Sequence, residues 1–289
     1  MSVKDFFRNK FGNAQAKAQK QLQERKIEFT PGSFLKQISD GNVENVTLFI
    51  EAGMNVDTAD SAGETALMKA VKTGNGEIVK ALLNGGADPK KVNAEGLPPL
   101  IQAIRGHQIE AARALISGGA NVDARDNAGF SAVMLAVLEN QHDIAQAMIN
   151  AGADVLVQNH STLESALILS AQRGYTDLVE LLLKNVITKE DRDQKDKKGM
   201  TALAWASLNG HLDTVKLLCS KKAGPNETDT TGMTPFLHAC ATGHREVVIA
   251  LIDSGAYIQS KNKNNQGALQ LANDGGHTDV ASLLREKGA

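Results

Sequence analysis

The sequence predicts an all-α fold, a solenoid of about eight stacked helix-turn-helix units with short β-turn loops, preceded by an N-terminal amphipathic helix. Two observations predict it: residues of one type recur about every 33 positions, and an apolar helical stripe recurs within each period. Composition agrees, because only 4% of the residues are aromatic and 26 are glycine. Such a chain suits short, closely packed helices joined by tight turns.

The period is most visible in the residue that is expected to close the first helix of each unit. Successive members of this series are 33, 33, 33, 34, 36, 33 and 33 residues apart. Most are glycine or asparagine, the residue types that enter the left-handed region at a helix end most easily. His107 is the exception, and Gly106 beside it predicts a slightly rearranged turn. The series is Gly41, Gly74, His107, Asn140, Gly174, Gly210, Gly243 and Gly276. A second series, expected at the end of the second helix, is Gly53, Gly86, Gly119, Gly152, Gly255 and Gly288.

Between the two series lies an apolar stripe at helical spacing. Ile78, Val79, Leu82 and Leu83 are an example, and the same pattern recurs in later periods. This spacing gives a helix one broad apolar face. Neither helix of a unit is long enough to bury that face alone, so we expect like units to stack and bury it continuously.

One stretch carries a family resemblance. Thr234-Pro235-Phe236-Leu237-His238-Ala239, followed by Gly243-His244 and Gly255-Ala256, resembles the ankyrin repeat. The resemblance covers roughly Gly32 to Ala289, about nine-tenths of the chain. It implies that the histidines after the turn glycine bridge neighbouring repeats through backbone hydrogen bonds. Those histidines are His211, His244 and His277.

The composition predicts two parts, a basic amphipathic extension over residues 1–31 and a repeat domain over residues 32–289. Residues 1–30 hold seven basic and three acidic side chains. Val3, Phe7, Phe11, Ala14 and Ala18 would lie on one helix face with Phe6 at its edge, and Pro31-Gly32 would break the helix. Three roles stay open for this helix: covering the apolar end of the first repeat, docking in a partner's groove, or lying on an anionic membrane.

The unit around Leu167 is the least regular. It has Ser161-Thr162-Leu163 where a turn glycine is expected, and it lacks the closing Gly-Ala pair. The extra residues fall in the charged stretch 185–198. We expect a solvated insertion there, with a functional loop as the alternative.

No catalytic, cofactor-binding or metal-binding residues are expected, and we predict that the chain is not an enzyme. It has no His-Glu-x-x-His, no Cys-x-x-Cys and no Gly-Lys-Ser/Thr phosphate loop. A balance of 31 basic and 33 acidic residues argues against a nucleic-acid binder. Cys219 and Cys240 fall at apolar helical positions, where we expect small buried residues in a reducing compartment. No stretch resembles a membrane span or a signal peptide. We therefore expect a monomer in the cytoplasm, with any membrane contact made only by residues 1–30.

The expected partner is another protein. The family resemblance implies that partners bind a concave groove lined by the turn tips and the exposed side of each first helix. Apolar side chains in a row on such a surface are typical of binding anchors. The predicted partner-binding residues are Leu97, Phe130, Leu138, Met200, Trp205, Leu208, Met233 and His238. Phe130, Met200 and Met233 are expected to be exposed, whereas for Trp205 a core position is an open alternative. Polar neighbours expected in the groove are Lys72, Arg105, Glu139, Gln172, Arg173 and Asn209.

The predicted function is thus that of a protein-binding module, acting as an adaptor, a scaffold or an inhibitor. A bacterial effector or a regulatory subunit that targets another protein is one alternative. An enzyme with an unrecognised site is the other, and it is motivated only by the histidine content and the irregular loop.

Overall fold

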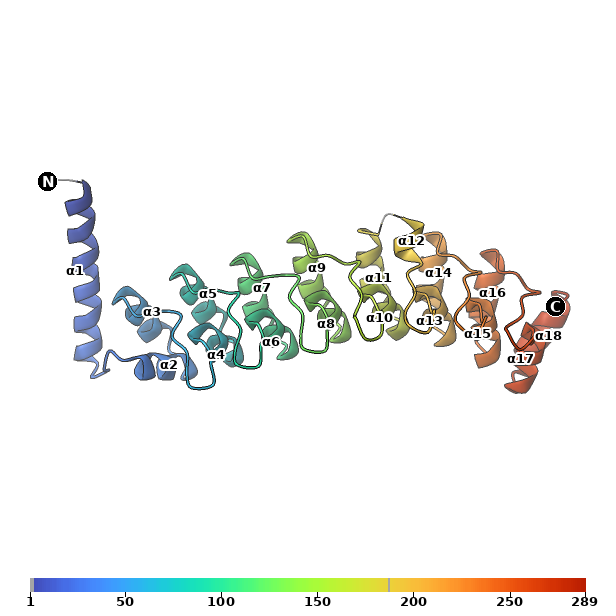
Figure 1. The fold of residues 1–289 in the computed structure, drawn as a ribbon, viewed down its shortest axis with the longest axis horizontal. Helices are drawn as coiled ribbons and strands as arrows, with labels where there is room; N and C mark the ends of the chain where they lie inside the picture. Colours follow the sequence, from blue (N-terminus) through green and yellow to red (C-terminus); the bar gives the residue numbers. More distant parts are fainter. Residues whose placement is uncertain (1–2, 187) are drawn as a thin grey trace. The chain divides into compact units, whose positions relative to one another are not determined.

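A computed structural model describes the backbone of residues 3–186 and 188–289 and the side chains of residues 13–186 and 188–289. The chain divides into two compact units. Unit 1 comprises Met1–Ala128 and Asn150–Gly152, and unit 2 comprises Gly129–Ile149 and Ala153–Ala289. Apart from the longer N-terminal helix α1 (Val3–Glu24), both units are built from short helices, as Figure 1 shows.

In unit 1 the helices after the first form two rows. Helices α2, α4 and α6 pack against one another in sequence, and α3, α5 and α7 pack likewise beside them. The helices are α1 (Val3–Glu24), α2 (Pro31–Ser39), α3 (Val43–Glu51), α4 (Ala66–Thr73), α5 (Gly76–Asn84), α6 (Pro99–Arg105) and α7 (Ile109–Ser117).

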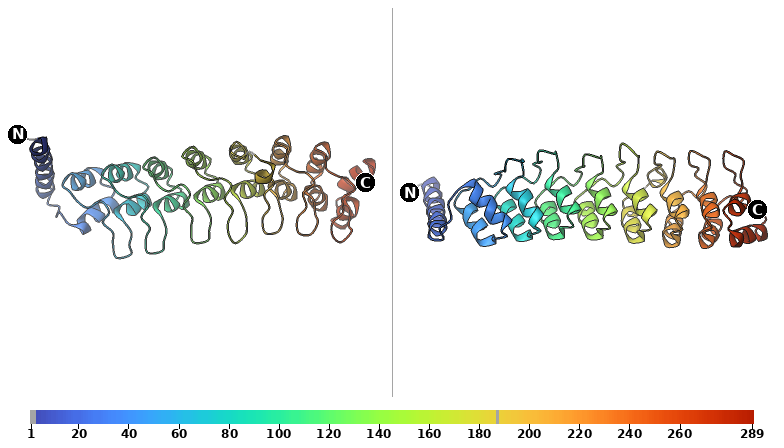
Figure 2. Two further views of the ribbon diagram at one scale, coloured as in Figure 1. Left: turned by 45° about the horizontal axis from the view of Figure 1, so that its top comes forward. Right: turned by 90° about the horizontal axis from the view of Figure 1, so that it is seen from below.

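Unit 2 repeats this arrangement. Helices α8, α10, α13, α15 and α17 form one row, and α11, α14, α16 and α18 form a second row. Within each unit the loops that join successive pairs project to one side of the helices (Figure 2). The helices are α8 (Ala132–Leu138), α9 (His142–Asn150), α10 (Ala166–Arg173), α11 (Thr176–Leu183), α12 (Lys189–Arg192), α13 (Ala202–Leu208), α14 (Leu212–Ser220), α15 (Pro235–Thr242), α16 (Arg245–Asp253), α17 (Ala268–Asp274) and α18 (Thr278–Glu286). Leaving out α1 and α12, the described residues form eight consecutive helix pairs, so the predicted architecture is confirmed.

The turn between the two helices of a pair is left-handed in every repeat. All eight residues predicted to close a first helix have positive φ, including His107 and Asn140 at 53°. His107 therefore takes the glycine conformation directly, and the predicted rearrangement of its turn is wrong. The second predicted series also has positive φ, and Lys222, with φ 66°, stands where that series lacks a glycine.

An Asp or Asn stands at the base of each loop that precedes a first helix from α4 onward. Its Oδ1 accepts a hydrogen bond from the backbone N–H two residues later, which closes an Asx turn. In unit 2, Asp196 Oδ1 accepts from Lys198 N at 2.8 Å and from Met200 N at 2.9 Å. The residues in this position are Asp60, Asn93, Asp126, Asn159, Asp196, Asp229 and Asn262.

Successive loops of unit 2 also bond to one another. Thr230 N donates to Lys198 O at 2.9 Å, and Lys263 N donates to Thr231 O at 3.0 Å. Gly199 permits this close approach, because its φ is 76° and a Cβ atom there would lie 2.8 Å from Thr230 N. The loops are therefore hydrogen-bonded to one another in a row.

The C-terminal part of α1 packs against α3. Ala18 and Leu22 are each 1% exposed, while Gln15 and Gln19 donate side-chain hydrogen bonds to Ala52 O at 3.0 and 3.2 Å. This packing covers the second helix of the first pair, and of the three predicted roles it supports capping. Ala14 is exposed. The other members of the predicted apolar face lie outside the residues whose side chains are described; they are Val3, Phe6, Phe7 and Phe11.

The predicted helix break at Pro31-Gly32 is misplaced. Helix α1 ends earlier, at Glu24, and Lys26 has φ 58°. Pro31 instead begins α2, where its fixed φ suits the first helical position and the missing N–H is not needed. Thr30 caps this helix by accepting a hydrogen bond from Ser33 N.

The charged insertion of unit 2 contains the short helix α12. Glu227 lies between Lys189, at 3.4 Å, and Lys195, at 3.2 Å. Burial opposes ionisation of Glu227, but the hydrogen bonds and charges of the two lysines outweigh it and lower its pKa. The predicted solvated insertion is therefore tied to the next loop by ion pairs, and residue 187 within it lies outside the described residues.

Candidate partner-binding surface

The loops before α13 and α15 are fastened to their helices by a second bond to the same loop carboxylate. Trp205 Nε1 donates to Asp196 Oδ2 at 2.8 Å, and one repeat later His238 Nε2 lies 2.9 Å from Asp229 Oδ2. The other carboxylate oxygen, Oδ1, holds the loop backbone in both cases. Each Asp thus joins the loop to the first turns of the following helix.

Unit 1 uses the same carboxylate position with cationic partners. Lys69 Nζ lies 2.7 Å from Asp60 Oδ2, and Arg105 reaches Asp126 Oδ2 at 2.6 Å. Lys69, Trp205 and His238 reach the loop carboxylate from the helix that follows the loop, whereas Arg105 reaches it from the preceding first helix, α6, so four types of side chain fasten these loops. Because these side chains fix the loops in the free protein, little ordering entropy remains to be lost when a partner binds.

The Asp229–His238 pair is mostly buried, with 6% and 12% of the two side chains exposed. Burial lowers the pKa of His238 and outweighs the opposing influence of Asp229. Burial also opposes ionisation of Asp229, but hydrogen bonds from Thr231, Met233 and His238 outweigh it and lower its pKa. At neutral pH the pair is thus a neutral imidazole that donates through Nε2 and an ionised carboxylate.

Two of the predicted partner-binding residues are buried. Met200 is only 3% exposed, so the expectation of an exposed side chain is wrong. Its backbone closes the base of the loop through bonds to Asp196 in both directions, and its side chain is part of the core. Trp205 is 9% exposed, so the core alternative is correct, because its indole is held against the buried carboxylate of Asp196.

The other six predicted residues are half-buried. Phe130 and Met233, expected to be exposed, show only part of their side chains, as do Leu138, Leu208 and His238 in unit 2 and Leu97 in unit 1. Trp205, Leu208, Met233 and His238 come together on the packed helices α13 and α15 and on the loop before α15.

Several predicted polar neighbours are already engaged. Lys72 pairs with Glu64, and Arg105 pairs with Asp126. Asn209 Nδ2 donates to Gln172 O at 2.8 Å, which joins α13 to α10. Glu139 and Arg173 are exposed.

The histidines that follow the turn glycines bridge neighbouring repeats, as the family resemblance implies. The Nε2 atoms of His211, His244 and His277 lie 3.0, 3.1 and 3.1 Å from backbone carbonyl oxygens of the preceding repeat. The glycine of that repeat leaves room for the ring, since a Cβ atom on Gly174 would lie 2.6 Å from His211 Nδ1. These rings are structural. No group of three His, Cys, Asp or Glu side chains converges as metal ligands would among the described residues.

Sequence reasoning missed two features of this surface. The loop carboxylates could have been found, because Asp or Asn recurs at that position with the period of the repeat. The second feature is Leu163, which is 42% exposed and has φ 56°. The sequence showed that the turn glycine is missing there. It did not show that a leucine would adopt the left-handed conformation in its place.

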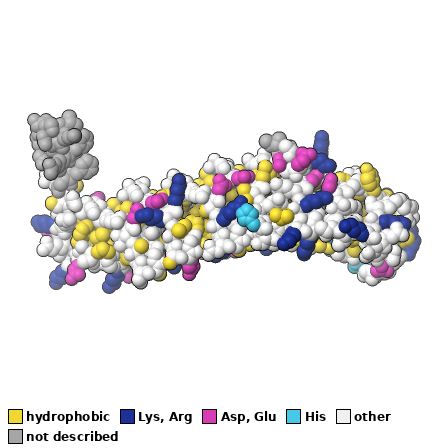
Figure 3. Space-filling model, in the orientation of Figure 1, with side chains coloured by type: hydrophobic (Ala, Val, Ile, Leu, Met, Phe, Trp, Pro, Cys, Tyr) yellow, Lys and Arg dark blue, Asp and Glu magenta, His cyan; other side chains and the backbone are white. Residues whose placement is uncertain are grey.

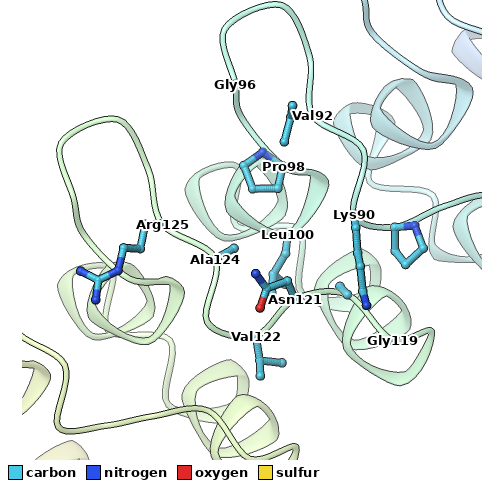
Figure 4. Close-up of a pocket in the computed structure, with 12 residues that line it drawn as sticks. Lys90, Val92, Gly96, Pro98, Leu100, Gly119, Asn121, Val122, Ala124 and Arg125 are labelled. Carbon is cyan, nitrogen blue, oxygen red and sulfur yellow. The ribbon is translucent and has the colours of Figure 1, made fainter.

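A pocket of about 490 Å³ lies in unit 1 between two successive loops (Figure 4). Val92 and Pro98 come from one loop, and Asn121 and Val122 from the next. Val92 is 52% exposed, which is unusual for a valine. The lining holds no histidine, cysteine or carboxylate, and beside its apolar side chains it includes Lys90, Asn121 and Arg125.

The face of the molecule shown in Figure 3 mixes acidic and basic side chains, and its hydrophobic side chains form separate small patches. None of the described helices combines the length and the apolarity needed to cross a bilayer.

Comparisons with known proteins agree with this geometry. A family model described as ankyrin repeats in three copies matches residues 34–93, 85–159, 134–229 and 221–289. Ankyrin repeat domain-containing protein 63 of Mus musculus is 39% identical over 94 residues, which are 31% of this chain and 24% of that protein. The ankyrin repeat and KH domain-containing protein CBG24701 of Caenorhabditis briggsae is 34% identical over 127 residues, 43% of this chain and 5% of that protein. The matched part thus spans a quarter or less of these relatives.

Among solved structures, the crystal structure of the human ASB11 ankyrin repeat domain superposes with a TM-score of 0.65. It covers 75% of this chain and 96% of that one at 24% sequence identity. This likeness concerns the fold, and it confirms the predicted helical solenoid.

Proposed function

This chain belongs to the ankyrin-repeat family, whose repeats are protein–protein interaction modules, and from that premise we propose that it binds a partner protein along its loops and first helices. The observation that carries the proposal is the double anchoring of the loops by Asp196 and Asp229. A surface held in this way is ready before the partner arrives.

The contact residues we propose are the six half-buried members of the predicted set, five of them on unit 2 and Leu97 separately on unit 1. Apolar side chains that are partly exposed on a rigid surface can be desolvated completely by a partner, and such residues dominate binding energy. Phe130 and Met233 are the proposed main anchors. Met200 and Trp205 support the surface from beneath. The six are Leu97, Phe130, Leu138, Leu208, Met233 and His238.

The test begins with capture of a partner by the full chain from a lysate, followed by calorimetric titration of the purified pair. Phe130→Ala and Met233→Ala should each weaken binding by about 1 kcal/mol or more, roughly fivefold. Ile109→Ala is the matched control, because Ile109 is 44% exposed at the start of a second helix. The proposed site would be refuted if a verified partner bound both groove variants as tightly as the unchanged chain. It would also be refuted if only Ile109→Ala weakened binding.

Whether the chain acts as an adaptor, a scaffold or an inhibitor depends on the partner's identity. We further propose that it works in the cytoplasm as a monomer. Cys219 and Cys240 are free thiols, and burial raises the pKa of Cys240 to about 12, so that thiol stays protonated and inert. Light scattering of the purified chain tests the monomer, and a dimer at micromolar concentration would contradict it.

A further inference from the structure

Four exposed lysines lie on two loops of unit 2 and are called here the lysine edge: Lys197, Lys198, Lys261 and Lys263. The aspartates of the loops before α13 and α15 do not offset them at the surface, and the carboxylate of Glu164 on the adjoining loop is half-buried and accepts a hydrogen bond from Thr162. Asp196 is 7% exposed, and only 6% of the Asp229 side chain is exposed, because both carboxylates turn inward to their loops. The exposed edge is therefore cationic, although the whole chain carries a net charge of −2.

The loops that carry the lysine edge are joined through the loop between them. Thr230 N donates to Lys198 O, and Lys263 N donates to Thr231 O, so the three loops lie side by side. Lys263 Nζ reaches back to Thr230 O at 2.7 Å. Lys198 Nζ lies 5.2 Å from the centre of the Trp205 ring. The ammonium groups of Lys198 and Lys263 are thus held in place. An ammonium has three N–H donors, so each still has N–H groups that can bond to a ligand.

An exposed apolar side chain borders this edge. Lys197 N donates to Thr162 O at 2.8 Å, which places Leu163 on the adjoining loop. Leu163 is 42% exposed and held in the left-handed region, where a leucine is strained. Strain of this kind is maintained where the surrounding structure enforces it, and it clusters at binding sites. Cations beside an exposed leucine match a ligand that is both acidic and apolar.

The same geometry argues against single-stranded nucleic acid. Such ligands need aromatic rings on which bases can stack, in addition to a cationic track. Trp205 is 9% exposed and already lies beneath Lys198. The stretches 195–200, 228–233 and 261–266 contain no aromatic residue, and Tyr257, which is 69% exposed four residues before Lys261, is a single ring rather than a row of stacking sites.

We propose that the lysine edge binds an acidic, extended segment of the partner protein, with Glu or Asp side chains at the lysines and an apolar side chain against Leu163. This inference rests on the proposed function and specifies the chemistry of the partner. Lys189 and Lys195 lie outside the edge, because both pair with Glu227.

The test uses the full chain and three probes of one charge sign: a fluorescent oligoglutamate peptide, an oligothymidine with the same number of charges, and phosphatidylserine vesicles. The variant Lys197→Gln/Lys198→Gln/Lys263→Gln removes three charges from the edge. The control Lys184→Gln/Lys216→Gln/Lys221→Gln removes three exposed charges from the second helices and helix ends of the same unit. Circular dichroism checks that both variants fold.

At low salt the edge variant should bind oligoglutamate roughly tenfold more weakly, and the control less than about twofold more weakly. Equal binding by both variants would overturn the proposal. The proposal would also be overturned if oligothymidine or the vesicles bound more tightly than oligoglutamate and the edge variant lost that binding. The edge would then be a nucleic-acid or membrane surface. The probes require no natural partner, so this test is independent of the test of the proposed function. Oligoglutamate binding can be unchanged in the edge variant while Phe130→Ala and Met233→Ala weaken partner binding, and the opposite combination is equally distinguishable.

Discussion

The indole Nε1–H of Trp205 donates to Asp196 Oδ2 at 2.8 Å, while the other oxygen of that carboxylate holds the backbone of its own loop. This bond satisfies the indole N–H of Trp205, which is 9% exposed. His238 and Asp229 repeat the arrangement in the next repeat. Trp205 and His238, which the sequence predicted to contact the partner, therefore hold the loops of unit 2 in place.

Replacing Trp205 by Phe should destabilise the protein by about 1–3 kcal/mol, because a buried carboxylate oxygen of Asp196 loses its partner. The measurement is urea unfolding followed by circular dichroism, since the variant removes the only tryptophan. Asp196→Asn and the double variant complete a double-mutant cycle. Additive effects across the cycle would show that the two side chains are not coupled.

His238 should make stability depend on pH. Its pKa is lowered in the folded protein, so the unfolded chain binds more protons as the pH falls below about 6.5, and acid favours unfolding. The stability that His238 contributes is thus present at neutral pH and lost on acidification. His238→Gln should flatten the curve of unfolding free energy between pH 7 and pH 5. Identical curves for the two proteins would contradict the lowered pKa.

Gly199→Ala should destabilise the protein by about 1–3 kcal/mol. The residue has φ 76°, and the added Cβ would lie 2.8 Å from Thr230 N on the neighbouring loop. Gly255→Ala is the matched control, because Gly255 also has positive φ, at 88°, but has open space around it. Thermal unfolding should show a larger loss for Gly199→Ala than for Gly255→Ala; equal losses would mean that the loops do not approach closely.

Leu163→Gly should stabilise the protein by up to about 1 kcal/mol. The left-handed conformation costs a leucine about 1–2 kcal/mol, and the greater freedom of glycine in the unfolded chain offsets part of the gain. Chemical denaturation measures the difference. A loss of stability would indicate that the leucine side chain makes packing contacts that outweigh its backbone strain.

The period of the sequence predicted the helix pairs because turn residues report backbone conformation directly. Even His107 and Asn140, which lack the freedom of glycine, occupy the predicted left-handed positions. The bridging His211 followed from the family resemblance. The start of the first repeat was harder, because Pro31 is compatible both with a helix break and with the first position of a helix.

The candidate surface was only partly predictable. The repeat pattern gave the right loops and helices, but not the direction of each side chain. A methionine after a turn glycine can point to solvent or to the core: Met200 is 3% exposed, whereas Met233, whose backbone bonds to its loop aspartate in the same way, is half-buried. The carboxylate of Asp196 acts through a bond to Trp205, nine residues along the chain, which no local pattern reveals.

Hydrogen–deuterium exchange with and without a captured partner tests most directly whether the loops and first helices form the binding surface. Binding should slow exchange in peptides that cover residues 195–208 and 228–242, while α14 and α16 exchange as in the free protein. Protection confined to α14 and α16, with no change in the loops, would contradict the account.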